Sequence, residues 1–136
     1  MRPALRTLTL SVLISLALLP RPLGAQEASG DGPRLAEAAV CLSVEERAPV
    51  GADDTFPAGT ERLFCFTDVR GAEDETIVHV WIHEGTTRAR VELDIGADRW
   101  RTWSSKRLLP SWTGSWEVKI MTAGGAVLET LAFTVE

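Results

Sequence analysis

The strongest constraint on the fold is an alternation of apolar and polar side chains that repeats every second residue. From about Ala38 onward this alternation runs in short stretches, which clusters of Gly, Pro and Asp separate. A two-residue period places successive side chains on opposite faces of a β-strand. No stretch combines the apolar spacing of an amphipathic helix with capping residues. The sequence therefore predicts an all-β domain.

We expect about seven strands in an antiparallel, immunoglobulin-like sandwich, because short strands joined by turns bury alternate side chains between two sheets. The clearest strand is the stretch 76–83, where Val78, Val80 and Ile82 form one apolar face. The segment 48–61 is rich in Pro, Gly and Asp and is expected to carry turns only. The seven expected strands cover residues 40–45, 63–69, 76–83, 88–95, 100–108, 115–122 and 127–135.

The first 25 residues have the order of a secretory signal peptide. Arg2 and Arg6 precede the apolar run Leu8–Leu19, and the small residues Gly24 and Ala25 close the segment. The apolar run has about a dozen residues, whereas spanning a bilayer takes about 20. We expect cleavage after Ala25 and export to the periplasm or the outside of the cell. An uncleaved amphipathic anchor is the alternative.

The chain divides into three parts on this interpretation. A signal peptide occupies residues 1–25, a polar leader occupies residues 26–37, and the β-sandwich domain occupies residues 38–136. The leader contains Gly, Ser and Pro without an apolar period, so we expect it to be disordered.

The charge of the chain excludes some classes of partner. Of the 14 Lys and Arg residues, three (Arg2, Arg6 and Arg21) lie in the expected signal peptide, whereas all 19 Asp and Glu residues follow it. The expected exported chain therefore has a net charge of −8. Binding to nucleic acid or to an anionic membrane surface requires clustered cations. We expect neither partner, and no stable membrane insertion after cleavage.

Cys41 and Cys65 are the only cysteines. An even number of cysteines in an exported protein favours a disulfide, so we expect these two to be bonded. Two free buried thiols are the alternative.

The sequence contains none of the motifs of common hydrolases, zinc proteases or nucleotide-binding loops. His79 and His83 lie about 13 Å apart along an extended strand, too far to share one metal ion. Ser104 and Lys106 lie about 6.6 Å apart on one strand face, beyond the contact that a nucleophile and its base need. We therefore expect no catalytic residue, metal ion or cofactor. A small hydrolase that uses Ser104 or Ser105 is kept as an alternative.

Five tryptophans and no tyrosine occur in the chain, and all five tryptophans lie between residues 81 and 116. Trp100 and Trp103 differ in parity, so a regular strand places them on opposite faces. An exposed Trp offers a flat apolar surface for a sugar ring, and Arg101 nearby can meet a carboxylate or phosphate. Packing of the tryptophans in the core is the alternative.

Three runs of residues carry a resemblance to a known family. They are His79-Val80-Trp81, the run Trp100–Lys106 (WRTWSSK) and the run Trp112–Val118 (WTGSWEV), preceded by Arg47-x-Pro49-x-Gly51 and Phe56-x-x-Gly59. In this order they resemble the bacterial domain-of-unknown-function family 2914, over about Val40–Val135. The resemblance implies an exported or membrane-attached bacterial protein. It implies no established activity and no catalytic residues.

These observations lead us to expect an exported, non-catalytic binding or accessory module of the bacterial envelope. Its partner would be an envelope glycan such as peptidoglycan, or an envelope protein. The candidate binding residues are His79, Trp81, Arg101, Trp103 and Lys106. Arg101 and Trp103 share a strand face, whereas Lys106 has the opposite parity unless a bulge intervenes. The first alternative is a structural protein-interaction domain that pairs through a sheet edge, and the second is the small hydrolase.

Overall fold

The computed structural model describes residues 32–136, and every regular element in this range is a β-strand. The expected signal peptide and most of the expected leader lie outside the described residues. The all-β prediction is confirmed, but the range holds ten strands where about seven were expected. They are β1 (Arg34–Cys41), β2 (Ser43–Glu45), β3 (Ala48–Val50), β4 (Thr55–Phe56), β5 (Arg62–Arg70), β6 (Thr76–His83), β7 (Thr86–Asp94), β8 (Arg99–Arg107), β9 (Gly114–Thr122) and β10 (Val127–Val135).

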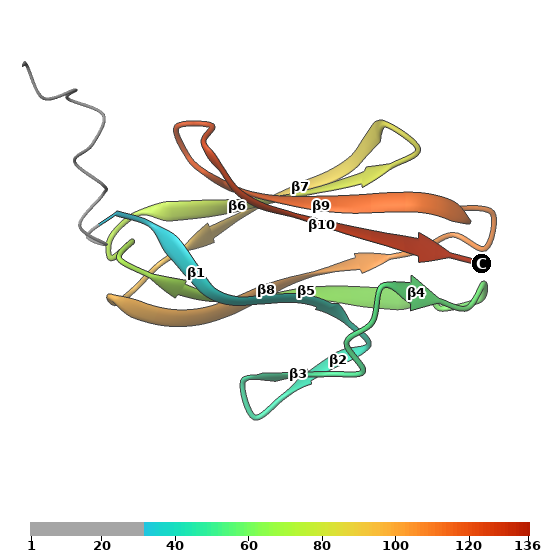
Figure 1. The fold of residues 1–136 in the computed structure, drawn as a ribbon, viewed down its shortest axis with the longest axis horizontal. Helices are drawn as coiled ribbons and strands as arrows, with labels where there is room; N and C mark the ends of the chain where they lie inside the picture. The colour runs from blue at the N-terminus through green and yellow to red at the C-terminus, as the bar shows by residue number, and fades with distance from the viewer. Residues whose placement is uncertain (1–31) are drawn as a thin grey trace, which may run out of the picture.

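The strands form a sandwich of two sheets. One sheet has the order β1-β5-β8 and the other the order β4-β10-β9-β6-β7, while β2 and β3 form a separate hairpin. Figure 1 shows the two sheets as stacked layers, with the β2–β3 hairpin on the outer side of the three-stranded layer. The pairs are antiparallel except β4–β10, which is parallel through Thr55–Thr134 and Phe56–Val135.

The three additional strands arise from one segment near the start of the domain. The stretch 40–45, expected as one strand, breaks at Leu42, where β1 ends and the chain leaves the sheet to form β2. Strands β3 and β4 lie in the segment 48–61, which was expected to carry turns only. Each of these two strands has three residues or fewer. An alternating apolar pattern of that length is too short to predict a strand.

Strand β1 also begins earlier than the expected domain boundary. It starts at Arg34, inside the segment 26–37 that composition assigned to the leader. Arg34 and Leu35 lie opposite Arg70 and Val69 of β5, and Leu35 packs against the core. Backbone pairing with a buried strand therefore orders residues that have the composition of a leader.

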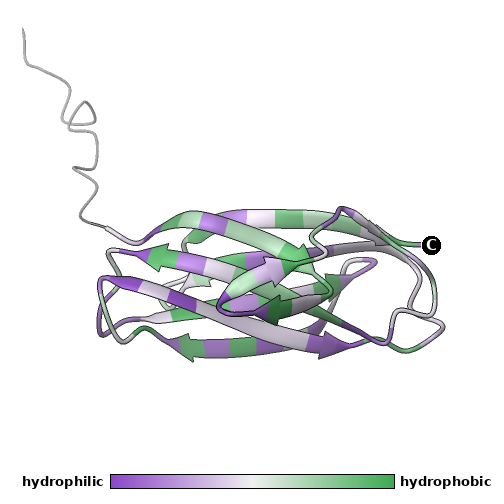
Figure 2. Ribbon diagram, turned by 90° about the horizontal axis from the view of Figure 1, so that it is seen from below, coloured by the Kyte–Doolittle hydropathy of each residue, from purple (hydrophilic) through white to green (hydrophobic). Residues whose placement is uncertain are grey.

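The core lies between the two sheets, whose strands contribute alternate side chains to it. Figure 2 shows the resulting alternation of hydrophilic and hydrophobic residues along the strands. On β6 the core face is the one that bears Ile77, His79 and Trp81, all of them fully buried. The opposite face carries Val78 and Val80. The face with histidine and tryptophan is thus the inner one.

A polar network occupies the middle of this core and joins the two sheets. Thr67 donates its hydroxyl hydrogen to the carbonyl of Thr102 at 2.9 Å, which leaves Thr67 Oγ1 to accept from His79 Nε2 at 3.4 Å. His79 Nδ1 then carries no hydrogen and accepts the Ser104 hydroxyl at 2.7 Å. Trp81 Nε1 donates to Ser104 Oγ at 3.1 Å. The hydrogen bonds thus specify a neutral imidazole.

The expected disulfide is not formed, and both cysteines are free and buried. Val40 lies opposite Cys65 in the β1–β5 register, and Cys41 lies opposite Phe64. Adjacent residues of a strand point to opposite faces, so the thiols of Cys41 and Cys65 lie on different sides of the sheet. Burial raises the pKa of both thiols. The prediction of a disulfide, which was based on the expected export of the chain, is therefore wrong.

We expect His79 to make the domain less stable in mild acid. Burial lowers the pKa of His79 to about 4 from its ordinary 6.5. The unfolded chain therefore takes up a proton as the pH falls below 6.5, while the folded chain resists protonation until about pH 4. The free energy of unfolding should fall by about 3 kcal/mol across this window. Urea unfolding at a series of pH values measures it.

The matched variant is His79→Gln, which keeps a polar side chain that does not titrate. Its unfolding free energy should change much less between pH 6.5 and 4 than that of the native chain, whatever its value at pH 7. An equally steep dependence in the variant would assign the acid sensitivity to other groups.

The free thiols predict that the fold does not depend on oxidation. Unfolded in guanidinium without a reductant, both Cys41 and Cys65 should react with iodoacetamide, and mass spectrometry counts the added groups. The melting temperature should be the same with and without dithiothreitol. A chain that resists alkylation until it is reduced would contradict the structure.

Candidate functional site

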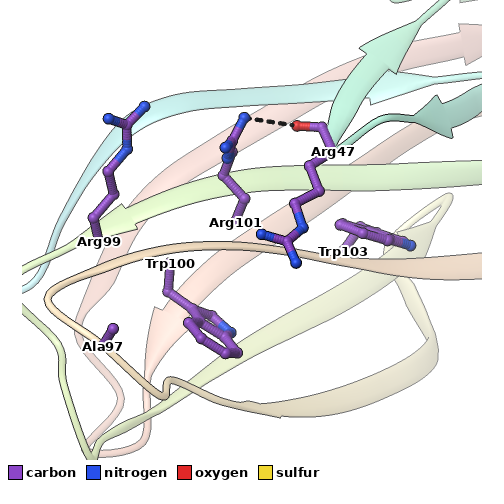
Figure 3. A pocket seen from close by; sticks show the side chains of 6 residues that line it. All are labelled: Arg47, Ala97, Arg99, Trp100, Arg101 and Trp103. Carbon is purple, nitrogen blue, oxygen red and sulfur yellow. Dashed lines mark hydrogen bonds between the residues drawn. The ribbon is translucent and has the colours of Figure 1, made fainter.

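A hollow of about 340 Å³ opens beside the first half of β8. Figure 3 shows the side chains that line it, with Arg47 reaching from the β2–β3 hairpin toward β8. We call this hollow the arginine pocket. Its lining residues are Arg47, Ala97, Arg99, Trp100, Arg101 and Trp103.

The alternation of β8 places three of these side chains on the outer face of the three-stranded sheet. Arg99, Arg101 and Trp103 lie two residues apart, which is about 7 Å per step along a strand. The Trp103 ring stacks on Phe66 of β5, with centroids 6.5 Å apart and an interplanar angle of 21°. Phe66 is fully buried, whereas Trp103 is 38% exposed. One face of the indole is thereby held by the sheet.

Trp100 enters the pocket from the other side of β8, as its parity predicts. Its ring packs on the backbone of Gly96, where an added Cβ would lie 3.0 Å from the nearest ring atom. Glycine at this position therefore permits the close approach of the ring. Trp100 remains 39% exposed. The pocket is thus flanked by two partly exposed indoles from opposite faces of one strand.

Arg47 comes from a hairpin with an unfavourable backbone conformation. Glu46 and Arg47 form its two-residue loop and both have positive φ, 50° and 59°. Turns of this kind favour Asn and Gly, because a Cβ in the left-handed region costs about 1 kcal/mol or more per residue. The conformation places the Arg47 carbonyl 3.4 Å from Arg101 Nη1, which donates to it. Strain of this type often accompanies a functional role.

The pocket carries positive charge in an otherwise acidic domain. Asp68, on β5 opposite Arg101, is largely buried and pairs with Arg70 through two hydrogen bonds of 2.9 and 3.1 Å. The bonds from Arg70, together with the nearby charges of Arg99 and Arg101, lower the pKa of Asp68. Within residues 32–136, no carboxylate forms an ion pair with Arg47, Arg99 or Arg101. Three guanidinium groups thus remain available to an anion.

The five candidate binding residues do not form one exposed face. Arg101 and Trp103 line the arginine pocket. His79 and Trp81 are fully buried in the core network, because the His/Trp face of β6 is the inner one. Lys106 does not line the arginine pocket. The β5–β8 register runs without a bulge, so Lys106 has the opposite orientation to Arg101 and Trp103, as parity predicts.

Lys106 belongs to a second aromatic cluster. Its Nζ lies 5.2 Å from the ring centroid of Trp112, and the guanidinium of Arg88 lies 4.6 Å from the same centroid. Trp112 in turn packs against Trp116, whose ring stacks on His83 at 4.6 Å. These contacts join β6, β7, β8, β9 and the loop before β9. The cluster packs side chains of the domain against one another.

The structure brings Ser104 within hydrogen-bonding distance of a histidine, but in a closed place. The distance from Ser104 Oγ to His79 Nδ1 is 2.7 Å, as in a nucleophile–base pair. Ser104 is only 5% exposed, His79 is fully buried, and Trp81 already donates to the serine oxygen. A substrate does not reach this oxygen between the packed sheets. The contact is therefore structural.

Two further observations concern the described part of the chain. Within residues 32–136, no three His, Cys, Asp or Glu side chains are grouped as metal ligands are. In the same range, no helix has the length and apolar character to cross a membrane.

The sequence interpretation missed Arg47, Arg99 and Trp100 as pocket residues. For Arg99 a signal existed, because it precedes Arg101 and Trp103 by two and four residues and so shares their face. The contribution of Arg47 depends on a hairpin of very short strands, which no periodicity indicates. The position of Trp100 depends on the close contact with Gly96.

A comparison with protein families gives a match over the second half of the chain. Residues 74–135 match the family described as "Protein of unknown function (DUF2914)". This segment contains β6 to β10, including the β8 residues of the arginine pocket, but not the hairpin that carries Arg47. No curated protein matches the chain. This match supports the resemblance to the DUF2914 family that the motifs around the tryptophans indicate.

Proposed function

We propose that this protein is an exported, non-catalytic binding module of the bacterial envelope that contacts a glycan, namely peptidoglycan, through the arginine pocket. The observation that carries the proposal is the pairing of two exposed indoles with three guanidinium groups that have no carboxylate partner in residues 32–136. Among residues 32–136, the exposed large aromatic side chains are Trp100 and Trp103, and both line this pocket. The expected signal peptide supports an envelope location.

The chemistry of the pocket supports a sugar ligand. A partly exposed indole that is already fixed on one side offers a flat apolar face, and stacking on it costs little side-chain entropy. Guanidinium groups donate paired hydrogen bonds to hydroxyl, carboxylate or phosphate oxygens. A site of about 340 Å³ falls within the range of small-ligand pockets.

Co-sedimentation with insoluble peptidoglycan tests this function. The exported chain should pellet with the polymer, and Trp103→Ala should reduce the bound fraction at least about fivefold, because an aromatic contact contributes about 1 kcal/mol. Leu109→Ala is the matched control, since Leu109 is a large exposed apolar residue that does not line the pocket. Melting curves establish that both variants are folded. Failure of the native chain to pellet would refute the proposed function.

A protein-interaction domain is the second candidate, because β7 forms one edge of the five-stranded sheet and, among residues 32–136, pairs only with β6. An edge strand of nine residues offers backbone groups to a partner strand. Its outer side carries Arg88, Arg90, Glu92 and Asp94. Charges on an edge oppose strand addition, so this candidate ranks below glycan binding.

A further inference from the structure

The charge of the arginine pocket restricts its ligand further than the proposed function does. We infer that the pocket recognises an acidic sugar, whose carboxylate or phosphate group lies among Arg47, Arg99 and Arg101 while its ring lies against Trp103. This inference rests on the proposed glycan binding and adds that the ligand must be anionic. Carboxylate and phosphate share the chemistry that a guanidinium recognises, so the experiment separates the two.

The first support is the distribution of charge around β8. The one buried carboxylate beneath the pocket, Asp68, is engaged by Arg70. The side chains of Arg99 and Arg101 stand above it on the same face of the sheet, without an ion pair among residues 32–136. Like charges this close repel each other, and an anionic ligand relieves the repulsion. A neutral sugar leaves this repulsion between the arginines in place.

The second support is the position of Arg47. It is the only cation of the pocket that does not come from β8, and a strained two-residue loop presents it. The Arg47 carbonyl accepts a hydrogen bond from Arg101, which holds the hairpin against the strand, and the Arg47 side chain extends toward Trp100 and Trp103. Guanidinium groups from two separate elements surround an anion more completely than two neighbours on one strand.

The third support is the arrangement of the aromatic rings. Trp103 has its inner face on Phe66, and Trp100 is held by Gly96. Both rings therefore have fixed orientations beside the cations. A ligand with a flat apolar side and a charged substituent matches this pairing, and an isolated inorganic anion uses only the arginines.

Titration of the ¹⁵N-labelled exported chain tests the inference, with the indole N–H signals as the readout. The probes are N-acetylmuramic acid, N-acetylglucosamine 6-phosphate, neutral N-acetylglucosamine and inorganic phosphate, all at one ionic strength. We expect the acidic sugars to shift the signals of Trp100 and Trp103, with about tenfold higher affinity than the neutral sugar. The buried Trp81 serves as the internal reference. The stronger of the two acidic probes identifies the carboxylate or the phosphate as the preferred group.

Two arginine variants test the role of charge. Arg99→Gln should weaken binding of the preferred acidic sugar about tenfold, the effect of one charge-assisted hydrogen bond. Arg107→Gln is its matched control, because Arg107 lies on the same strand and face but about 26 Å farther along. It should change the affinity less than about twofold.

Arg47→Gly separates loss of binding from loss of folding. Glycine adopts the positive φ of this position without strain, so the melting temperature should stay the same or rise. Affinity for the acidic sugar should nevertheless fall about tenfold. If the variant loses affinity but keeps its melting temperature, misfolding does not explain the loss of binding.

The outcomes distinguish this inference from the function on which it rests. Equal affinity for neutral and acidic sugars would overturn the inference and leave glycan binding by stacking. Equal affinity for inorganic phosphate and the acidic sugars would overturn it as well, since the ring then contributes nothing. Shifts from acidic sugars without co-sedimentation of peptidoglycan would support the inference and refute peptidoglycan as the ligand.

Discussion

The arrangement of the two sheets depends on the hydrogen bonds of the Ser104 hydroxyl group. It donates to His79 and accepts from Trp81, and these residues belong to the five-stranded sheet, whereas Ser104 belongs to the three-stranded one. Apolar packing alone tolerates small shifts of one sheet over another, but a buried hydrogen bond tolerates little. The network thus fixes which side of β8 faces inward. The outward direction of Arg101 and Trp103, and with it the pocket, follows from strand parity.

The same network explains how far the sequence predicts this domain. Alternation identified β5 to β10 but placed the first strand at residues 40–45, where β1 ends and β2 begins. Parity correctly separated Lys106 from Arg101 and Trp103. It did not reveal that the inner face of β6 carries His79 and Trp81, because valine and isoleucine on the other face have the stronger apolar pattern. Burial of the histidine becomes understandable only with Ser104 and Thr67, which lie on strands far along the chain.

Other features depend on register and short-range geometry, which periodicity does not encode. The even number of cysteines favoured a disulfide, yet one step of register between β1 and β5 turns the two thiols to opposite faces of the sheet. The arginine pocket combines residues of β8 with a hairpin of three-residue strands, whose turn has no favoured turn residue. A sequence that follows local preference would place Asn-Gly there. At this position the backbone departs from local preference while the Arg47 carbonyl accepts a hydrogen bond from Arg101.

The parallel pairing of β4 with β10 has a consequence for the order of folding. Thr55 and Thr134 are in contact although 79 residues separate them, while β6–β7 and β9–β10 are hairpins of neighbouring strands. Closing a long loop costs more chain entropy than closing a hairpin, and the two-residue β4 offers few contacts in return. We therefore expect high contact order to make folding slow, with the hairpins early and the β4 edge last. Amide protons of this edge should then exchange with solvent by local opening, well before the central strands do.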